Sequence, residues 1–280
     1  MESIDKIIDA LIENYNNSFC KINEGDYIGD DGLMRCIVCG EAKQRKHNGR
    51  LIGRQCRCVR EEVEKKLEQR RKAEAENRIY AFRNASLMNG ILTEARFDKC
   101  LITANNERNL NICKKYVEKF EQMKEINQGL LLWGPVGTGK SYAAACIANE
   151  LIDRAHTVVM TSIVRLLSLA EDDEFDMLMH RMTDCELMIL DDLGAERGTD
   201  YALEKVYYII ESRHRAGKPM IITTNLTLTD MRQIEDERYT RTYDRVLDNC
   251  YPMQWTGPSW RKVQAKDKFK NFENMLGIKQ

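Results

Sequence analysis

The chain has 280 residues, 43% of them hydrophobic, so it is long enough to bury a substantial core in one large and one small domain. The formal net charge of −1 excludes a global field that would hold DNA or a membrane surface, so any basic patch must be local. Met1 to Leu11 lack the apolar core of a secretory signal, and no run approaches the roughly 18 apolar residues that cross a bilayer. We therefore expect a cytoplasmic protein without a membrane partner.

The first sixty residues combine a predicted helix with a segment that carries cysteines. Apolar residues at helical spacing predict an amphipathic helix over residues 2–16, namely Ile4, Ile7, Ile8, Leu11 and Ile12. Its apolar stripe either docks on its own domain or serves as a handle for a partner protein. Residues 35–60 are basic and too few for an apolar core. We expect residues 1–60 to form an N-terminal domain.

Four cysteines in this segment have the spacing of a metal site. Cys36-x2-Cys39 and Cys56-x-Cys58 offer enough thiolates for a closed tetrahedral Zn²⁺ site, which would replace the missing apolar core. Since the second pair is tightly spaced, His47 could replace one cysteine as a ligand. Free thiols and an iron–sulfur cluster are the alternatives. The clustering favours a metal in a reducing cell over a secreted disulfide scaffold.

Basic residues crowd the same segment against a single acid, Glu41. They are Arg35, Lys43, Arg45, Lys46, Arg50, Arg54, Arg57 and Arg60. Such density suits contact with phosphate groups. Without interleaved aromatic residues to stack on bases, a solvated surface or a patch for an acidic protein is an equally open interpretation.

A charged segment separates this region from the rest of the chain. Residues 61–84 are dense in Glu, Lys, Arg and Ala, which predicts a solvated connecting helix, and we place a helical linker over residues 61–90. Residues 91–280 then form the large domain. Its first predicted helix spans residues 108–123, with one apolar face made by Leu110, Cys113, Val117 and Phe120.

From residue 130 onward, strands and helices alternate as they do in parallel sheets. A buried strand over residues 130–133 precedes a glycine loop and a helix over residues 140–154. Further strands are expected over residues 157–161, 187–190, 220–224 and 251–255, with helices between them. The pattern predicts an α/β domain with a five-stranded parallel sheet flanked by helices.

The glycine loop fits the phosphate-binding pattern G-x-x-x-x-G-K-[ST], and it lies between a predicted strand and a predicted helix, as that pattern requires. Its residues are Gly134, Pro135, Val136, Gly137, Thr138, Gly139, Lys140 and Ser141. Glycines let backbone N–H groups converge on phosphates at the positive end of the helix. We expect Lys140 to neutralise the β- and γ-phosphates of ATP and Ser141 to ligate Mg²⁺.

Polar residues follow two of the predicted strands at the edge where α/β sheets bind ligands. Asp191 is the expected acid on the Mg²⁺ side, and Asp192 would polarise the attacking water. Asn225 follows the strand over residues 220–224 and would orient water or the γ-phosphate. For Asp192 and Asn225, a turn residue at the end of a strand is the alternative.

Taken in order, the segments GPVGTGKS, LMILDDLGAE, ITTN, RTYDR and SWR resemble the ATPase core of the AAA+ superfamily, specifically the DnaC/DnaI-type replicative helicase loaders. The resemblance covers residues 97–263. The related IstB-type transposition helper ATPases share much of this pattern, and the amino-terminal cysteine segment favours the loaders.

The resemblance implies further roles for polar residues. Asn225 would be sensor 1, Arg261 sensor 2, and Arg241 an arginine finger that reaches the ATP of a neighbouring subunit. Arg241 and Arg245 stand four residues apart, so both project from one side of a helix, as the paired basic residues of the family do. Because a finger adds positive charge where the transition state spreads negative charge, hydrolysis would depend on assembly. An exposed helix arginine is the alternative for Arg241.

Two features depart from the family pattern. Asp192 stands where many relatives have glutamate, and Glu196, four residues further on, is the alternative for positioning water. Only about 25 residues follow the fifth predicted strand, so we expect a minimal or absent lid beside Arg261.

As a whole, the resemblance implies an ATPase that loads the replicative DNA helicase onto single-stranded DNA at replication initiation. Its partners would be a hexameric helicase gripped by residues 1–60, single-stranded DNA, and further copies of the chain in an ATP-dependent oligomer. A transposition helper is the nearest alternative. A DNA-binding regulator that uses ATP only structurally is another, and a small-molecule kinase lacks support because nothing in the chain resembles a substrate lid.

Overall fold

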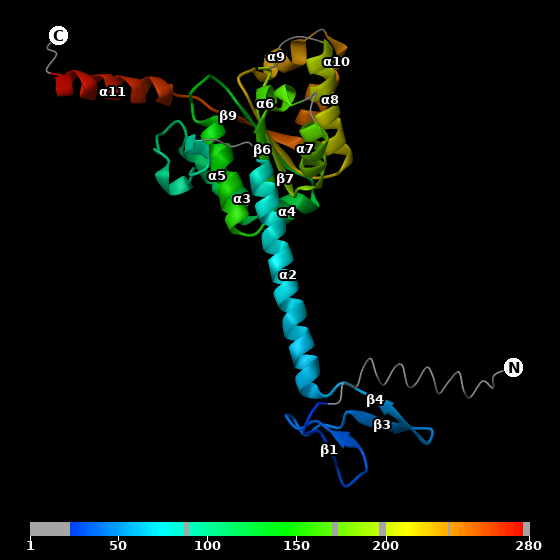
Figure 1. The fold of residues 1–280 in the computed structure, drawn as a ribbon. Coiled ribbons are helices and arrows are strands. Elements are labelled where there is room, and N and C mark those ends of the chain that lie inside the picture. Colours follow the sequence, from blue (N-terminus) through cyan, green and yellow to red (C-terminus); the bar gives the residue numbers. More distant parts are fainter. Residues whose placement is uncertain (1–22, 87–89, 170–172, 196–199, 235, 277–280) are drawn as a thin grey trace. The chain divides into compact units, whose positions relative to one another are not determined.

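The computed structural model describes residues 23–86, 90–169, 173–195, 200–234 and 236–276. The helix predicted over residues 2–16 and the alternative acid Glu196 lie outside the described residues. The chain divides into two compact units, Met1–Glu74 and Ala75–Gln280 (Figure 1). In the part of the chain that the structure describes, every helix is too short or too polar to span a membrane.

The first unit is built from two small antiparallel ribbons. β1 (Tyr27–Ile28) pairs with β2 (Met34–Arg35), and β3 (Gln44–His47) pairs with β4 (Arg50–Gly53). A buried ion pair lies where a larger domain would have apolar residues. Lys43 Nζ is 2.5 Å from Asp26 Oδ2, and both side chains are almost inaccessible.

Buried charges are costly to desolvate unless they are paired and hydrogen-bonded. The second carboxylate oxygen of Asp26 accepts a hydrogen bond from the backbone N–H of Ile37, at 3.1 Å. This pair therefore ties the segment just before β1 to the loop that follows β2.

The charged segment forms one long helix, α2 (Arg57–Ala85), which contains the division between the two units. The helix that we predicted over residues 61–84 is therefore present, and it begins four residues earlier. Its first turn already includes Cys58, so the helix start is part of the cysteine segment.

The second unit contains a five-stranded parallel sheet, as predicted. The strands are β5 (Gly129–Trp133), β6 (Val158–Ser162), β7 (Leu187–Leu193), β8 (Met220–Thr224) and β9 (Cys250–Gln254). Their order across the sheet is β6-β7-β8-β5-β9, and every neighbouring pair is parallel. β5, which leads into the glycine loop, therefore lies between β8 and β9.

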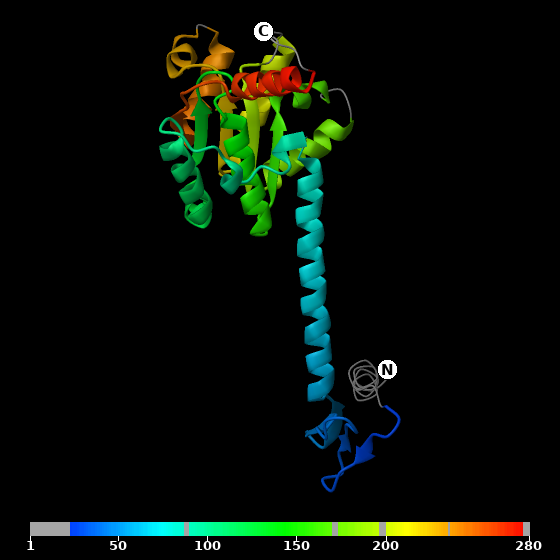
Figure 2. The same ribbon diagram turned by 90° about the vertical axis from the view of Figure 1, so that its left-hand side faces the viewer.

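Helices cover both faces of this sheet, as Figures 1 and 2 show. One face packs against α3 (Glu107–Glu118) and α5 (Lys140–Asp153). The other packs against α6 (Ile163–Ser168), α7 (Asp173–Asp184), α8 (Asp200–Arg215) and α10 (Glu237–Asn249). The remaining elements are η1 (Gly90–Leu92), η2 (Phe97–Lys99), α4 (Phe120–Glu125), α9 (Leu228–Gln233) and α11 (Trp260–Leu276).

Side chains of the central strands alternate between the two cores. Leu130 and Leu132 of β5 belong to the core under α3 and α5, whereas Leu131 belongs to the core on the opposite face. Strands buried on both faces read as continuous apolar runs rather than as alternating ones. This explains why the sequence predicted them without a period of two.

Two further predicted elements differ from the structure by more than one residue. The single helix predicted over residues 108–123 is divided into α3 and α4 at Lys119, whose φ of −107° and ψ of 21° are not helical. The strand predicted over residues 187–190 continues to Leu193. It does so through an irregularity, because the pairing of β7 with β8 shifts register between Leu190 and Leu193.

Candidate functional site

The glycine loop connects β5 to α5. The residues that follow β9 pack closely against this loop. Gly134 has φ +139°, and a Cβ there would lie 2.1 Å from the carbonyl oxygen of Trp255. Gly137 has φ +83°, and a Cβ there would lie 2.2 Å from Ser259 Oγ. Both the backbone conformation and the neighbouring atoms therefore require glycine at these two positions.

Lys140 begins α5 and is only 4% exposed. Its ammonium donates to the carbonyl oxygens of Gly134 at 2.7 Å and Pro135 at 2.8 Å, and to Asn225 Oδ1 at 2.9 Å. Burial lowers the pKa of Lys140, and the nearby carboxylate of Asp192 opposes this effect. The predicted phosphate-binding lysine and the predicted sensor asparagine thus lie in direct contact.

Asp191 and Asp192 lie at the register shift of β7. The irregular backbone there gives the two side chains different surroundings. Asp192 has φ +59°, in the left-handed region that is uncommon for a residue with a side chain. Asp191 is 9% exposed, and its Oδ1 accepts a hydrogen bond of 2.5 Å from Thr223 Oγ1. The same hydroxyl accepts a hydrogen bond from the backbone N–H of Asp192, at 2.9 Å. One threonine of β8 therefore contacts both acids.

The two predicted magnesium ligands are neighbours. Burial raises the pKa of Asp191, and hydrogen bonds from the hydroxyl groups of Thr223 and Ser141 oppose that rise. Mg²⁺ prefers hard oxygen ligands and usually takes one or two from the protein and the rest from phosphates and water. The carboxylate of Asp191 and the hydroxyl of Ser141 fit this donor set.

A cavity of about 300 Å³ lies beside the loop. Its polar side is formed by the predicted residues Gly137, Thr138, Gly139, Lys140, Ser141, Asp192, Asn225 and Arg261. Its size is at the lower end of the range for small-molecule sites, which are typically concave, with a few convergent polar groups. The structure thus brings most of the predicted nucleotide-binding residues to one cavity.

The rest of the cavity wall was not predicted from the sequence. It is formed mainly by Ile91, Leu92, Lys99, Cys100, Leu101, Asn106, Leu110, Tyr142, Trp255 and Trp260. This wall is largely apolar and suits a flat, poorly hydrated group such as a nucleotide base. Most of these residues belong to η1, η2 and the loop after them, which follow no motif. The only available signal was Trp260, which stands next to Arg261 in the quoted SWR segment.

The start of α11 is fastened to the glycine loop. The backbone N–H of Trp260 donates to the carbonyl oxygen of Gly137, at 2.9 Å. This bond places Arg261 at the cavity, where its positive charge also lowers the pKa of Lys140. The residue predicted as sensor 2 is therefore at the site, although a single helix follows β9 among the described residues.

Arg241 and Arg245 of α10 are not among the residues that line the cavity. Arg241 is 61% exposed and lies 2.6 Å from Glu237 in an ion pair within the helix. Arg245 Nε is 2.9 Å from Oε2 of Glu211, a poorly exposed residue of α8. Within one chain, the structure brings Arg261 to the cavity and leaves Arg241 and Arg245 on α10.

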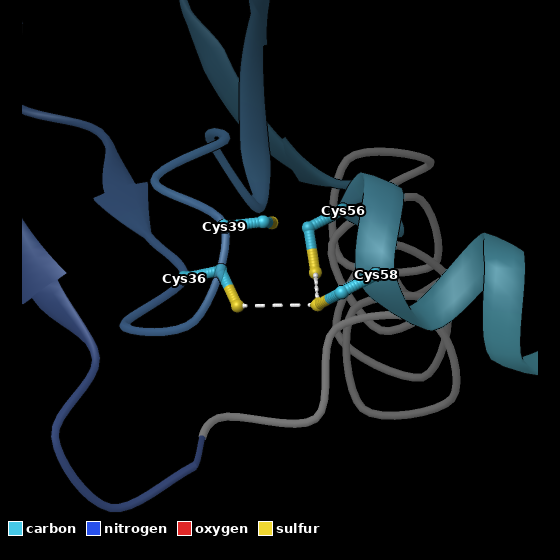
Figure 3. Close-up of side chains that lie close together, drawn as sticks. All are labelled: Cys36, Cys39, Cys56 and Cys58. Carbon is cyan, nitrogen blue, oxygen red and sulfur yellow. Dashed lines mark hydrogen bonds between the residues drawn. The ribbon is translucent and has the colours of Figure 1, made fainter.

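The cysteines of the first unit converge on one point, as Figure 3 shows. Cys36 and Cys39 come from the loop after β2, and Cys56 and Cys58 come from the start of α2. All four Sγ atoms lie within 4.8 Å of one another, with 3.5 Å from Cys36 to Cys58 and 3.4 Å from Cys56 to Cys58. A tetrahedral Zn²⁺ with bonds of about 2.3 Å holds sulfurs about 3.8 Å apart.

Backbone N–H groups also point at these sulfurs. Those of Cys39 and Val38 lower the pKa of Cys36, and those of Cys58 and Glu41 lower the pKa of Cys39 to about 6. Such hydrogen bonds favour the thiolate, which is the form that binds metal. The four sulfurs therefore fit Zn²⁺, and His47 is not a member of the group.

Part of the predicted basic surface is neutralised within the first unit. The carboxylate of Glu41 accepts hydrogen bonds from Arg54 Nη2 at 2.5 Å, from Arg60 Nη2 at 2.9 Å and from the backbone N–H of Arg57. Arg45, by contrast, is exposed on β3, next to the exposed Lys46. Positive charge that Glu41 does not neutralise is therefore exposed on this ribbon.

Comparisons with known proteins give a consistent result. The model of a family described as IstB-like ATP binding protein matches residues 60–268. The phage-like element PBSX protein XkdC of Bacillus subtilis is 28% identical over 145 residues, which are 48% of this chain and 54% of that protein. The replicative helicase loader DnaC of Escherichia coli is 23% identical over 175 residues, 59% of this chain and 70% of DnaC.

The replicative helicase loader DnaI of Bacillus subtilis is 24% identical over 148 residues, which are 48% of each protein. The chain thus spans only about half the length of XkdC and DnaI. A crystal structure of DnaI superposes with a TM-score of 0.53 at 22% identity and covers 62% of this chain and 94% of that one. A crystal structure of a protein from Streptococcus pyogenes superposes with a TM-score of 0.52 at 20% identity and covers 62% of this chain and 92% of that one. At these identities the structural likeness shows the fold.

Proposed function

The chain belongs to the family of IstB-like ATP binding proteins, and from this premise we propose that it hydrolyses ATP and loads a replicative DNA helicase onto single-stranded DNA. The observation that carries the proposal is the cavity beside the glycine loop. Lys140, Asn225 and Arg261 meet there, next to the contact between Asp191 and Ser141. Positive charge, a polarising amide and hard oxygen ligands are what phosphoryl transfer requires.

Each polar residue then has a separate task. Lys140 and Arg261 bind the phosphates, and Asn225 orients the γ-phosphate or the attacking water. Ser141 and Asp191 would hold Mg²⁺, which supplies charge neutralisation on the phosphate oxygens. Asp192, at the edge of the cavity and exposed more than Asp191, positions the water. The apolar wall binds the base.

Hydrolysis in this proposal depends on a second copy of the chain. Arg241 is exposed on α10 and away from the cavity of its own subunit. We infer that it acts as an arginine finger on the ATP of a neighbour, with Arg245 beside it on the same helix. A finger of this kind accelerates hydrolysis by about 10³–10⁵-fold.

The loading role is supported by the relatives DnaC and DnaI, which are named replicative helicase loaders. The first unit, with a zinc-bound cysteine cluster and the basic ribbon around Arg45 and Lys46, would contact the helicase. A transposition helper ATPase is the second candidate, because the family model itself is described by IstB. Capture of a replicative helicase by the zinc-loaded full chain with ATP favours the loader. Capture of a transposase alone would contradict it.

Nucleotide binding is tested with Lys140→Ala. Loss of the ammonium from a buried phosphate site should abolish ATP binding in a calorimetric titration. Lys115→Ala, which removes an exposed lysine from α3, is the matched control and should bind ATP normally. Unchanged affinity in Lys140→Ala would contradict the assignment of the cavity.

The trans-acting arginine is tested by mixing variants. Arg241→Ala should bind ATP but lose turnover by about 10³-fold or more, and Asp192→Asn should do the same by losing the water-positioning acid. In a mixture, Asp192→Asn subunits can supply Arg241 to sites that retain Asp192, so part of the activity should return. Arg245→Ala measured in parallel shows which arginine carries the effect. Wild-type turnover in Arg241→Ala would refute its role.

A further inference from the structure

Cys100, which lines the nucleotide cavity, faces a second cysteine that lies behind the cavity wall. Cys100 follows η2 and is partly exposed at the cavity, and Cys146 lies in α5 and is fully buried. Their Sγ atoms are 3.9 Å apart. We propose that Cys100 and Cys146 form a reversible, peroxide-sensitive disulfide that lowers the affinity of the cavity for ATP. The regulatory part of this inference rests on the proposed binding of ATP in the cavity.

The two thiols differ in their pKa values, and this difference makes one of them the nucleophile. The hydrogen bond with the thiol of Cys146, helped by the charge of Lys114, lowers the pKa of Cys100 against the opposing effects of burial and Asp98. The hydrogen bond to Cys100, together with burial, raises the pKa of Cys146. Because the thiolate is the nucleophile, Cys100 is the reactive member, and it is also the one that a solute in the cavity can reach.

The oxidant is hydrogen peroxide, and the reaction has two steps. The thiolate of Cys100 attacks one peroxide oxygen, the O–O bond breaks, and hydroxide leaves, which gives a sulfenic acid. The sulfur of Cys146 then attacks that sulfur, the S–O bond breaks, and water leaves with the proton of Cys146. In total, two thiols and one peroxide give one disulfide and two waters, and the two electrons lost by sulfur reduce the peroxide.

Formation of the bond would move the wall of the cavity. The sulfurs must approach from 3.9 Å to about 2.05 Å. Cys146 lies between Ala145 and Ile147 in a fully buried part of α5, so most of the movement falls on Cys100. Lys99 and Leu101, on either side of Cys100, line the cavity and would shift with it. A wall that shifts with Cys100 fits the nucleotide less well, because close-packed parts of a protein are sensitive to small displacements.

The effect must be reciprocal. If the disulfide weakens ATP binding, then bound ATP must disfavour the disulfide by the same factor. Bound ATP would in addition cover Cys100 from the peroxide. The ATP-bound chain is therefore protected, and the empty chain is the one that oxidation traps.

Peptide mapping of the zinc-loaded full chain tests the pair directly. Trypsin cleaves after Lys99, Arg108, Lys114, Lys140 and Arg154, so it releases Cys100, Cys113 and Cys146 in separate peptides, residues 100–108, 109–114 and 141–154. After brief treatment with peroxide, the first and third peptides should appear linked and should separate on reduction. ATP should slow the linkage about tenfold, and the oxidised chain should bind ATP about tenfold more weakly, within the usual range of coupling between sites.

Three variants make the test specific. Cys100→Ser and Cys146→Ala should lose both the linked peptide and the effect of peroxide on ATP affinity. Cys113→Ser, which removes a third cysteine from the same core, should keep both. The cysteines of the first unit are present in all three variants, so their oxidation cannot account for a difference between them.

The outcomes separate this inference from the proposed function. If wild-type chain without nucleotide gives no linked peptide, the disulfide is refuted. If the link forms but neither responds to ATP nor changes ATP affinity, the regulatory role is refuted. A reduced chain that does not bind ATP contradicts the proposed function and the regulatory role with it, while the peptide map still decides whether the thiols react.

Discussion

Thr223 of β8 connects the two acids at the end of β7. It donates to the buried carboxylate of Asp191 and accepts from the backbone N–H of Asp192. The register shift of β7 and the left-handed backbone of Asp192 are therefore held by one hydroxyl group on the neighbouring strand. A buried polar group that loses its partner costs about 1–3 kcal/mol, more when it is charged.

We predict that Thr223→Val binds ATP nearly normally but loses most of its Mg²⁺-dependent turnover. Valine keeps the shape and removes both hydrogen bonds, so Asp191 and Asp192 are no longer fixed in direction. Steady-state hydrolysis and ATP titration measured together check this separation. Thr161→Val, another buried threonine on an adjacent part of the sheet, should retain turnover. Equal loss of binding and turnover in Thr223→Val would show a general structural defect instead.

The sequence predicted that a residue belongs to the site only where a local sequence pattern includes that residue. The glycine loop through Ser141 is such a pattern, because loop, strand and helix are contiguous in the chain. Thr223 sits inside a predicted strand and reads as one more β-branched residue. Its contact with Asp191 comes from the pairing of β7 and β8, and pairing of strands distant in sequence leaves no local signal.

At the scale of elements, the apolar runs in the sequence were sufficient to predict the five strands of the sheet. They were not sufficient to predict the local geometry of each element. The strand over residues 220–224 was predicted with its observed bounds, and the other four differ by one to three residues at one or both ends. The break at Lys119 was missed because the apolar spacing continues through it. At the break, Phe120 turns into the core against His156, with ring centroids 4.9 Å apart. The order of the strands and the cavity wall from η1 and η2 required the fold itself.

Glu186 lies just before β7, at the edge of the sheet opposite the cavity. It contacts residues of α4 and of the segment just before β6. Lys124 of α4 lies 2.5 Å from Oε1 of Glu186, and His156 Nδ1 lies 3.2 Å from the same oxygen. The backbone N–H of Thr157 donates to Oε2 at 2.9 Å. These partners hold the pKa of Glu186 far below its ordinary value of 4.5, despite the opposing effect of partial burial.

We predict that Glu186→Gln is less stable than the wild type at pH 7 and that the difference shrinks in acid. Since the pKa is lowered by folding, the ionised form stabilises the folded state above the ordinary pKa of 4.5, and this contribution is lost as the pH falls below that value. Urea unfolding followed by circular dichroism at pH 7 and pH 4 checks the sign. Glu150→Gln, from an exposed pair with Arg154, should change little at either pH. A difference that grows in acid would contradict the assignment.

At the scale of the whole molecule, the two units are stabilised by different means. The second unit has two apolar cores, one on each face of its sheet. The first has a buried ion pair between Lys43 and Asp26 and the cysteine cluster. The described residues of the first unit contribute to neither of these cores, and we propose that zinc binding, which in structural sites provides about 10–16 kcal/mol, stabilises this unit instead.

We predict that each chain contains one zinc ion and that its removal unfolds the first unit while the second unit stays folded. Elemental analysis should find the metal in wild type and not in a double variant with Cys36→Ser and Cys39→Ser. Chelation should speed tryptic cleavage within residues 35–60, and ATP binding by the second unit should persist. A metal-free wild type that resists trypsin over those residues would show that the four thiols alone suffice.

The bond from the backbone of Trp260 to Gly137 gives the molecule an intrinsic optical reporter. Two of the three tryptophans of the chain, Trp255 and Trp260, lie in the wall of the cavity. The backbone of Trp260 is hydrogen-bonded to the glycine loop. Indole emission depends on the polarity around the ring. A ligand that fills the cavity should therefore change the fluorescence of the unlabelled protein, so that its arrival and departure can be followed in real time by stopped flow.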